Sequence, residues 1–509
     1  MRLVQRHWDL FLASLLLLGA AVALVLLDDR NGTLRAGTTP RTIAWYLVAF
    51  AGFGLAAWWS ERRTINPWVL WTVPIAARLL LLLTEPTLSD DVYRYLWDGH
   101  VATQGISPYL HPINAAALDP VEIPIRRLAN NPGLASPYLP TAHGVFTAAA
   151  FTLPSTAVVM QTVMVGFDLA TAGLLSGLLV RAGLPRRRVL LYLWNPLVIV
   201  EIAHGAHLDA LMVMLTVAAL AVGLHGARGG LADHGHRWRR VGSGVLLALA
   251  TLTRPLPALA GPVLWPRWRW GGRVAFALTV AALLLPFGLG RAGWGLDAAA
   301  TGTGVFGSAR VYSRDFHFNG ALNGVLTPGS TLATVVAGGA MAAVLLVVWR
   351  RAEAAGRATI ARGADDGAAR VRADLRLVVV PVMAYVVLTP VMHPWYLVLL
   401  MALLPFVTPA SGEAADRWLL TLPWYYLAAA VSFSYLTYLD PDRFGERTWV
   451  LWLEWAPTLL GLAAVVFWVH FALQAEGGPA SAPGSSTPSV GQRDLVAVVD
   501  PTGPDREQH

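Results

Sequence analysis

Cysteine and lysine are both absent from this chain of 509 residues, and charged residues of either sign are scarce. Without cysteine, the protein can form neither a disulfide framework nor a thiolate metal site. Charged side chains make up 14% of the sequence, whereas soluble domains are about 25% charged. This deficit excludes the ordinary soluble globular class.

Hydrophobic residues, by contrast, make up 55% of the chain and occur in nearly uncharged blocks. Several blocks, taken with their flanks, reach the roughly 20 residues that a helix needs to span a bilayer. The sequence therefore predicts an all-α polytopic membrane protein with about 12–14 transmembrane or re-entrant helices. The clearest blocks are residues 13–27, 45–59, 189–200, 208–224, 274–289, 332–349, 377–388 and 463–473.

Arginine clusters predict the orientation of the chain, because positive residues in short loops mark the cytoplasmic side of a membrane protein. The clusters are Arg62–Arg63, Arg181 with Arg186–Arg188, Arg237 with Arg239–Arg240, and the run from Arg350 to Arg376. We therefore expect a cytoplasmic N-terminus and an uncleaved first helix. The clusters also account for the net charge of +7, so no nucleic-acid partner is predicted. The predicted extracytoplasmic segments are residues 85–154, 204–207, 291–329, His393 and 438–447.

One apolar run, residues 241–264, is interrupted by the sequence Thr253-Arg254-Pro255-Leu256-Pro257, whose two prolines break a helix. A single crossing here would place the arginines of 267–273 outside and the 291–329 segment inside. We therefore predict a broken or re-entrant element, which is tolerated at membrane depth where it lines a protein cavity. The transmembrane domain is expected to cover residues 1–474, followed by a disordered cytoplasmic tail over 475–509.

The first predicted outer segment begins with a short polar helix. Ser89 is a plausible N-cap, and Asp91, Arg94, Tyr95 and Asp98 then share one helix face. A carboxylate held beside an arginine at a membrane surface can accept a proton or stabilise a cationic partner. An amphipathic surface helix with a capping acid pair explains the same pattern about equally well.

A second polar cluster follows the helix-breaking pair Asn195-Pro196 and contains Glu201, His204, His207 and Asp209. Ionisable residues at this depth are candidates for function. They could bind a phosphate, a sugar hydroxyl or a metal ion, but the spacing matches no established metal motif. No metal site is therefore predicted.

Three further segments carry candidate site residues, and two of these segments combine polar with aromatic side chains. Arg254 suits a lipid phosphate, unless it is an arginine that merely extends to the membrane surface. A second outer segment contains His317 and Asn319, each next to a phenylalanine. A third contains the sequence His-Pro-Trp-Tyr, beginning at His393. An interfacial belt would explain the Trp and Tyr there but not the histidine.

Taken together, these motifs resemble the actinobacterial polyprenyl-phosphate-mannose-dependent mannosyltransferases. These are GT-C fold enzymes, and the closest are the α-1,6-mannosyltransferases of lipomannan and lipoarabinomannan assembly. The resemblance departs at Leu139, where the family often has proline after tyrosine, and at Arg254, where relatives often have lysine. The motifs are S-x-D-V-Y-x-Y-x-x-D-G from Ser89, G-I-x-P-Y from Gly105, Y-x-P from Tyr138, W-N-P from Trp194, G-x-H-x-D from Gly205, F-N-G from Phe318 and H-P-W-Y from His393.

The resemblance implies transfer of mannose from a polyprenyl-phosphate-mannose donor to a glycolipid or lipoglycan acceptor, with inversion, outside the cytoplasmic membrane. Some GT-C enzymes need a divalent cation, and the sequence does not decide this; no cofactor is predicted. Asp91 matches the general base, Asp90 is the second choice, and the leaving phosphate needs a cation. Alternatives are another polyprenyl-phosphate sugar, such as arabinose or glucose, or a non-enzymatic flippase. The expected substrate-binding residues are Arg94, Tyr95, Asp98, Tyr109, Tyr138, His204, His207, Asp209, Arg254, His317, Asn319, His393, Trp395 and Tyr396.

Overall fold

The computed structural model describes residues 8–27, 38–224, 233–296, 302–324, 326–327, 330–362, 367–408, 420–439 and 447–476. The chain divides into two compact units, Met1–Leu462 and Ala463–His509. Every predicted site residue belongs to the first unit. The predicted disordered tail lies outside the described residues from position 477 onward, as does most of the predicted outer segment 438–447.

Every regular element in the described part of the chain is helical. The longer helices are α1 (Trp8–Leu27), α2 (Thr39–Arg62), α3 (Pro67–Leu81), α4 (Asp91–Thr103), α5 (Pro140–Thr152), α6 (Ala157–Arg181), α9 (Asp209–Gly223), α10 (Asp233–Thr251), α11 (Gly261–Gly288), α12 (Gly307–Asp315), α13 (Thr331–Arg362), α14 (Gly367–Leu388), α16 (Leu422–Ala430) and α17 (Thr448–Glu476). The short helical segments are η1 (Ala116–Val121), η2 (Pro124–Arg127), η3 (Arg186–Val189), α7 (Leu190–Leu193), α8 (Pro196–Ile199), η4 (Val200–His204), η5 (Leu256–Ala260), η6 (Ala321–Gly324), η7 (Pro394–Leu397), α15 (Val398–Leu403), η8 (Leu404–Phe406) and η10 (Val431–Leu439). The two β-bridges, both involving Val391, are isolated.

Six of the described helical stretches are long and apolar enough to cross a membrane: Trp8–Leu27, Thr39–Arg62, Ala157–Arg181, Leu256–Gly288, Thr331–Ala355 and Thr448–Trp468. Three shorter apolar helical stretches accompany them, Pro67–Leu81, Asp209–Gly223 and Pro394–Phe406. Large apolar side chains on these helices, such as Leu278 and Val335, remain 65% and 64% exposed, as expected for helix faces that contact lipid. The prediction of an all-α polytopic membrane protein is confirmed.

A buried ion pair fixes the helices that precede the second polar cluster. The Nε atom of Arg78 on α3 donates to Oδ2 of Asp168 on α6 at 2.5 Å, and both side chains are fully buried. The hydroxyl of Tyr192 on α7 donates to the other oxygen of Asp168 at 2.6 Å. An Nη1 donor of Arg78 also binds the carbonyl oxygen of Leu193 at 2.8 Å. This network holds α7 against α3 and α6, and α7 leads into the segment that carries Glu201 and His207.

The chain turns back on itself within the apolar run 241–264. Helix α10 ends at Thr251, η5 follows, and α11 then packs along α10, with Trp268 Nε1 donating to Ser243 Oγ at 2.9 Å. A second break lies inside α11 at Arg269, whose φ of 50° and ψ of −161° are not helical. The structure thus contains two bends in this region, with Arg254 at the first of them. The membrane depth of this element stays a prediction.

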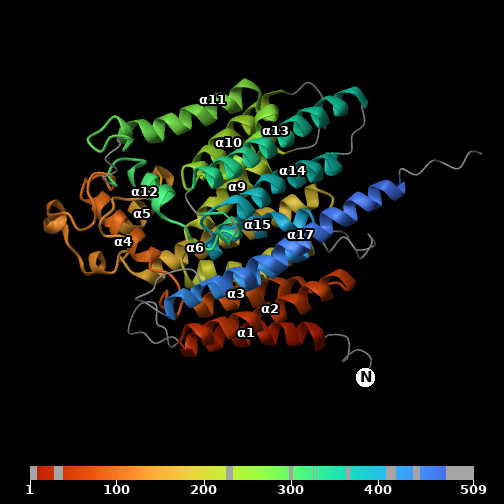
Figure 1. Ribbon diagram of the computed structural model, residues 1–509, viewed down its shortest axis with the longest axis horizontal. Helices are drawn as coiled ribbons and strands as arrows, with labels where there is room; N and C mark the ends of the chain where they lie inside the picture. The colour runs from red at the N-terminus through yellow and green to blue at the C-terminus, as the bar shows by residue number, and fades with distance from the viewer. Residues whose placement is uncertain are drawn as a thin grey trace, which may run out of the picture. The chain divides into compact units, whose positions relative to one another are not determined.

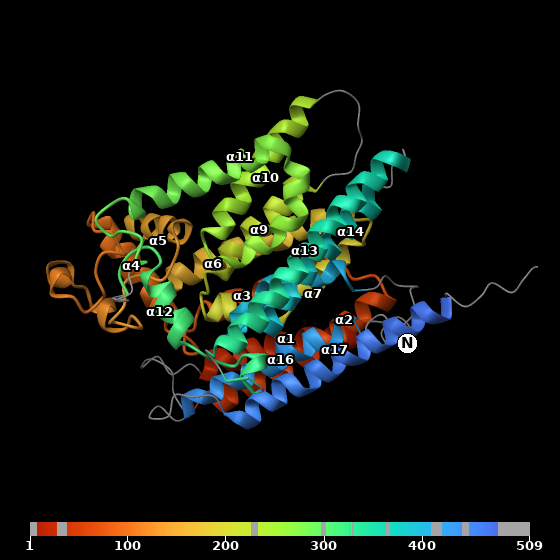
Figure 2. The same ribbon diagram turned by 45° about the horizontal axis from the view of Figure 1, so that its top comes forward.

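Loops 85–154 and 291–329 lie together. Helices α4, α5 and α12, which belong to these loops, gather at the same end of the first unit's long helices (Figures 1 and 2). The Ala135 amide donates to the Gly302 carbonyl at 3.1 Å, and Ser308 Oγ donates to the Ala135 carbonyl at 2.6 Å. The Gly304 amide likewise donates to the carbonyl oxygen of Tyr109 at 2.8 Å. The second loop therefore packs directly on the first, as segments on one side of a membrane can.

Helices α4 and α5 approach so closely at Gly99 that an added Cβ would lie 2.5 Å from the carbonyl oxygen of Phe146. We expect Gly99→Ala to destabilise the protein by about 1–3 kcal/mol, because backbone on α5 cannot move aside as a flexible side chain could. Thermal unfolding in detergent measures the loss. Gly144→Ala on α5 is the matched control, since its Cβ would meet nothing within 4 Å. Equal melting of both variants and the wild type would contradict this prediction.

Candidate active site

Helix α4 presents the acid pair at its N-terminus. It begins at Asp91, and Asp90 at the N-cap position provides no side-chain cap. Ser89, the predicted N-cap, lies one residue further out, where its Oγ accepts from the Asp91 amide at 3.3 Å. Both faces of α4 are buried, since Arg94 and Asp98 are 1% and 2% exposed. The helix is therefore part of the packed interior of the loop rather than an amphipathic helix lying on a surface.

One amide side chain connects the two acids. The Nδ2 atom of Asn130 donates to Asp91 Oδ1 at 2.7 Å and to Asp90 Oδ1 at 2.9 Å. The second oxygen of Asp91, Oδ2, lies 3.5 Å from the Tyr95 hydroxyl and 3.9 Å from Nδ1 of His207. The Asp91 side chain remains 17% exposed. It is therefore held by Asn130 through Oδ1 and remains partly exposed.

The environment of Asp91 favours proton uptake. Burial raises the pKa of its carboxyl above the ordinary value, while the nearby Arg254 guanidinium and the Asn130 hydrogen bond act in the opposite direction. Burial also raises the pKa of Asp90, and the negative charge of Asp91 adds to that increase. A carboxylate whose pKa is raised above the ordinary value is a stronger proton acceptor and is suited to act as a general base.

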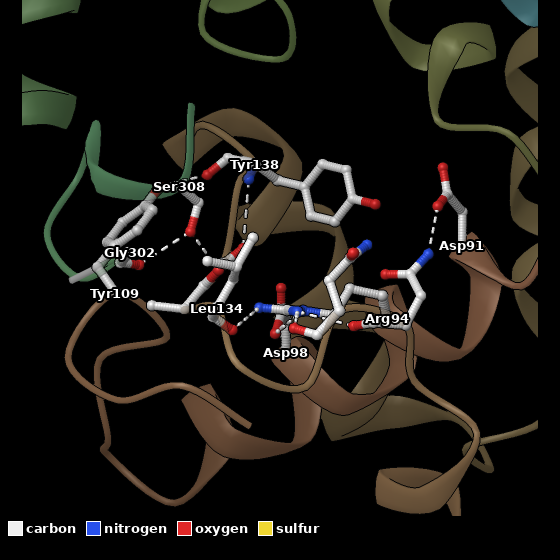
Figure 3. A network of polar contacts seen from close by, with 12 residues as sticks. Asp91, Arg94, Asp98, Tyr109, Leu134, Tyr138, Gly302 and Ser308 are labelled. Atoms are coloured by element: carbon white, nitrogen blue, oxygen red, sulfur yellow. Dashed lines mark hydrogen bonds and ion pairs between the residues drawn. The ribbon is translucent and has the colours of Figure 1, made fainter. Parts of the chain in front are cut away.

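Arg94 and Asp98 engage the loop backbone. Arg94 Nε donates to Asp98 Oδ1 at 3.0 Å, and its Nη1 and Nη2 atoms donate to the carbonyl oxygens of Asn130 at 3.1 Å and Leu134 at 3.0 Å. Figure 3 shows Arg94 between Asp98 and the loop segment that carries Leu134. Both residues were predicted to bind substrate. In the structure, Arg94 and Asp98 bind each other, and Arg94 also binds backbone carbonyl oxygens of the loop.

His207 lies between two carboxylates. Its Nε2 atom is 3.4 Å from Glu201 Oε2, and its Nδ1 atom is 3.9 Å from Asp91 Oδ2. The π-helical segment η4 and the left-handed residue Ala206, with a φ of 56°, give the chain the bend that brings this ring back beside Glu201. Glu201 also accepts from the Tyr435 hydroxyl, which lies 2.9 Å from each of its oxygens. Neither ring nitrogen of His207 makes a hydrogen bond of good geometry within the described residues.

An aromatic stack leads away from His207. Its ring stacks on Trp395 with centroids 3.8 Å apart, Trp395 stacks on His393 at 4.4 Å, and His393 stacks on Phe318 at 4.9 Å. The segments carrying Phe318 and His393 are joined by their backbones. The Phe318 amide donates to the Pro390 carbonyl at 3.1 Å, and the Met392 amide donates to the Phe318 carbonyl at 2.7 Å. Three sequence motifs thus meet in one aromatic stack, which begins at His207.

Arg254 supplies a cation to the same region. Its Nε atom lies 3.2 Å from Asp209 Oδ2, and its guanidinium carbon lies 5.4 Å from the ring centroid of Tyr396. The arginine side chain is 19% exposed, whereas that of Asp209 is 1% exposed. Arg254 also stabilises the ionised form of Asp91 and so lowers its pKa. The site therefore combines an accessible acid with a partly exposed guanidinium.

His204, although predicted for the site, is engaged by structural contacts. Its Nδ1 atom lies 2.7 Å from Thr84 Oγ1, and its Nε2 atom lies 3.0 Å from Thr87 Oγ1. Gln161 Nε2 donates to the carbonyl oxygen of His204 at 3.1 Å. These bonds fix the start of loop 85–154 against the segment carrying His207.

The remaining predicted residues surround the site at different distances. Tyr138 contacts Tyr95 edge-on at 5.0 Å, and its carbonyl accepts from the Tyr109 hydroxyl at 2.7 Å (Figure 3). Asn319 points elsewhere, since its Nδ2 atom donates to Glu454 Oε2 at 2.5 Å. His317 is half-buried between α12 and the aromatic stack. No group of three or more His, Asp or Glu residues in the described part of the chain is arranged to hold a metal ion.

Asn130, Glu201 and Tyr435 are the site residues that prediction from sequence did not select. Glu201 was part of the second polar cluster, so its burial beside His207 had a sequence signal. Asn130 had only a weak signal, as a polar residue of a long loop. Tyr435 had none, because it lies 234 positions along the chain from Glu201.

The helical membrane fold defines an integral membrane protein, and the acid, histidine and arginine cluster is its candidate active site. The family described as alpha-(1->6)-mannopyranosyltransferase, N-terminal domain, matches residues 7–269, slightly more than half of the chain. The chain belongs to this family and is a mannosyltransferase. The matched region contains α4, the second polar cluster and Arg254. No curated protein and no solved structure matches the chain.

Proposed function

We propose that this mannosyltransferase takes mannose from a polyprenyl-phosphate-mannose donor and transfers it to a glycolipid or lipoglycan of the cell envelope. The observation that carries the proposal is the position of Asp91, whose Oδ2 atom lies 3.9 Å from His207 in a region that also contains Arg254. This reaction needs a carboxylate that removes a proton from the acceptor hydroxyl and a cation that stabilises the leaving phosphate.

In the proposed reaction, Asp91 Oδ2 removes the proton from an acceptor hydroxyl as that oxygen attacks C1 of the mannose. The bond between C1 and the phosphate oxygen breaks, and the polyprenyl phosphate leaves with the electron pair. A single displacement of this kind inverts the configuration at C1. Arg254 stabilises the charge that develops on the phosphate, and His207 and His393 line the same region as hydrogen-bonding groups.

We further propose a GT-C architecture in the cytoplasmic membrane, with the site on the extracytoplasmic side and both termini cytoplasmic. The packing of loops 85–154 and 291–329 on each other supports a shared side, and the arginine clusters support its orientation. The polyprenyl chain would lie in the bilayer beside the protein. No metal ion is assigned a role, since Arg254 provides the positive charge.

Two alternatives remain distinguishable by experiment. A donor carrying arabinose or glucose would use the same acid and cation, but the family is one of mannosyltransferases. A flippase would concentrate its polar residues near the bilayer midplane. Here, Asp90, Asp91 and Asn130 lie in loop 85–154 instead.

The proposal is tested with the full chain purified in detergent. Radiolabelled mannosyl-phosphoryl-polyprenol and a crude lipoglycan acceptor are supplied, with arabinosyl and glucosyl donors in parallel reactions. We expect label in the acceptor from the mannosyl donor only. Transfer from another donor would change the sugar, whereas movement of the lipid across proteoliposomes without transfer would support the flippase.

A further inference from the structure

We infer that Asn130 is a positioning residue that holds Asp91 by one oxygen and thereby selects Oδ2 as the atom that takes the acceptor's proton. The inference rests on the proposed function, because it assigns an atom to the general-base step. It concerns loop 85–154, whose long central segment contains none of the motifs that first indicated the family.

The amide of Asn130 has two hydrogens, and the structure provides an acceptor for each. Nδ2 lies 2.7 Å from Asp91 Oδ1 and 2.9 Å from Asp90 Oδ1. A carboxylate oxygen that accepts such a bond is stabilised as an anion and is less able to take a proton. Among the described residues, the contacts of Asp91 Oδ2 are with the Tyr95 hydroxyl at 3.5 Å and with His207 Nδ1 at 3.9 Å. Oδ2 is therefore the more basic oxygen.

The position of Asn130 is itself fixed from α4. Its carbonyl oxygen accepts from Arg94 Nη1 at 3.1 Å, and Arg94 is held by Asp98 at 3.0 Å and by the Leu134 carbonyl at 3.0 Å. Arg94 lies one turn after Asp91 on the same helix. Helix α4 therefore carries both the acid and, through Arg94, the residue that orients the acid. This assigns positioning roles to Arg94 and Asp98.

The same contact contributes to the ionisation of Asp91. Burial raises the pKa of this carboxyl, and the Asn130 bond is one of the contacts that lower it. Loss of the amide therefore raises the pKa of Asp91. Because the base must be ionised to act, the acid limb of the pH–rate profile then moves to higher pH. The other charged or titratable groups that face Asp91 are Asp90, Arg94, Tyr95, Tyr138, His207, Asp209, Arg254, Tyr312 and Tyr396.

The experiment compares pH–rate profiles of mannose transfer for the wild type and Asn130→Ala. We expect the acid limb to move up by about one pH unit, which lowers the rate about tenfold on that limb. The rate on the alkaline side should fall less. Asn130→Asp, which adds a third carboxylate, should move the limb further in the same direction. Asn114→Ala is the matched control, because Asn114 is an exposed loop residue without a side-chain hydrogen bond in the described residues.

A carboxyl titration by difference infrared spectroscopy, with Asp91→Asn as the reference, reports the same shift without relying on turnover. If Asn130→Ala does not fold, Asn130→Ser, which keeps one donor, is measured in its place. An active enzyme whose acid limb and carboxyl titration are both unmoved overturns the role of Asn130 alone. Absence of any transfer by the wild type overturns the proposed function, and with it the choice of base.

Discussion

Replacing Asp91 with asparagine is expected to lower mannose transfer by about 10²- to 10⁴-fold, the range typical for loss of a positioned general base. The change is nearly isosteric, and the new side chain keeps an oxygen for the Asn130 amide, which lies 2.7 Å from the present Oδ1. It removes the negative charge and with it the ability of this side chain to accept the acceptor's proton. Donor binding and thermal stability should therefore change little. Initial transfer rates with saturating donor measure the effect.

Asp90→Asn is the control for this prediction. Asp90 shares the Asn130 amide through a bond of 2.9 Å, and an asparagine there can still accept it. We expect less than a tenfold loss of rate, because the essential base is unchanged. If Asp90→Asn is inactive and Asp91→Asn is active, the reaction class stands and the base is Asp90. If both variants transfer mannose normally, neither acid is the base.

Arg254→Gln is expected to lower transfer by about 10²- to 10³-fold, as removal of a group that stabilises developing negative charge does in other enzymes. The variant should also destabilise the protein. Asp209, 1% exposed and 3.2 Å from Arg254 Nε, would lose its cation in a buried position. That penalty is roughly 3 kcal/mol, at the lower end for a buried pair because Arg254 is partly exposed. Rates and thermal unfolding need to be measured together.

A double variant, Arg254→Gln with Asp209→Asn, separates the two effects. It removes the unpaired charge, so we expect stability to recover while transfer remains low. Arg314→Gln provides the surface comparison, because its pair with Asp315 is exposed and such pairs contribute little to stability. Recovery of transfer in the double variant would mean that Arg254 only neutralises Asp209 and does not stabilise the phosphate.

Local pattern was sufficient for the membrane class and for α4. Uncharged blocks predicted the helices, because a bilayer imposes length and hydropathy on each segment independently. The four-residue periodicity placed Asp91, Arg94 and Asp98 on one helix, and the Thr-Arg-Pro sequence at Arg254 marked the bend after α10. The N-cap was misplaced by one residue, because Ser89 binds the Asp91 amide without starting the helix.

Contacts between distant segments could not be predicted in the same way. Asn130 lies 39 positions from Asp91, and its hydrogen bonds depend on the path of an irregular loop. Polarity alone also does not say what a buried side chain binds. Arg94 had the properties expected of a substrate ligand, and the structure gives its donors to backbone carbonyls. The motif resemblance indicated that several segments share a site, but not which atoms meet there.

The backbone bonds between Phe318 and the segment of Pro390 and Met392 bear on how the site moves. An added Cβ on Gly320 would lie 2.6 Å from the Thr389 carbonyl oxygen, so the two chain segments are also in close contact there. The segment around Phe318 and Gly320 is therefore not free to swing away as a lid. For this segment to open, the two backbone hydrogen bonds must break together, or the stacked ring of His393 must move with the segment. In deuterium exchange, the amides of Phe318 and Met392 should open as one cooperative unit, and access to the site should be timed by that opening.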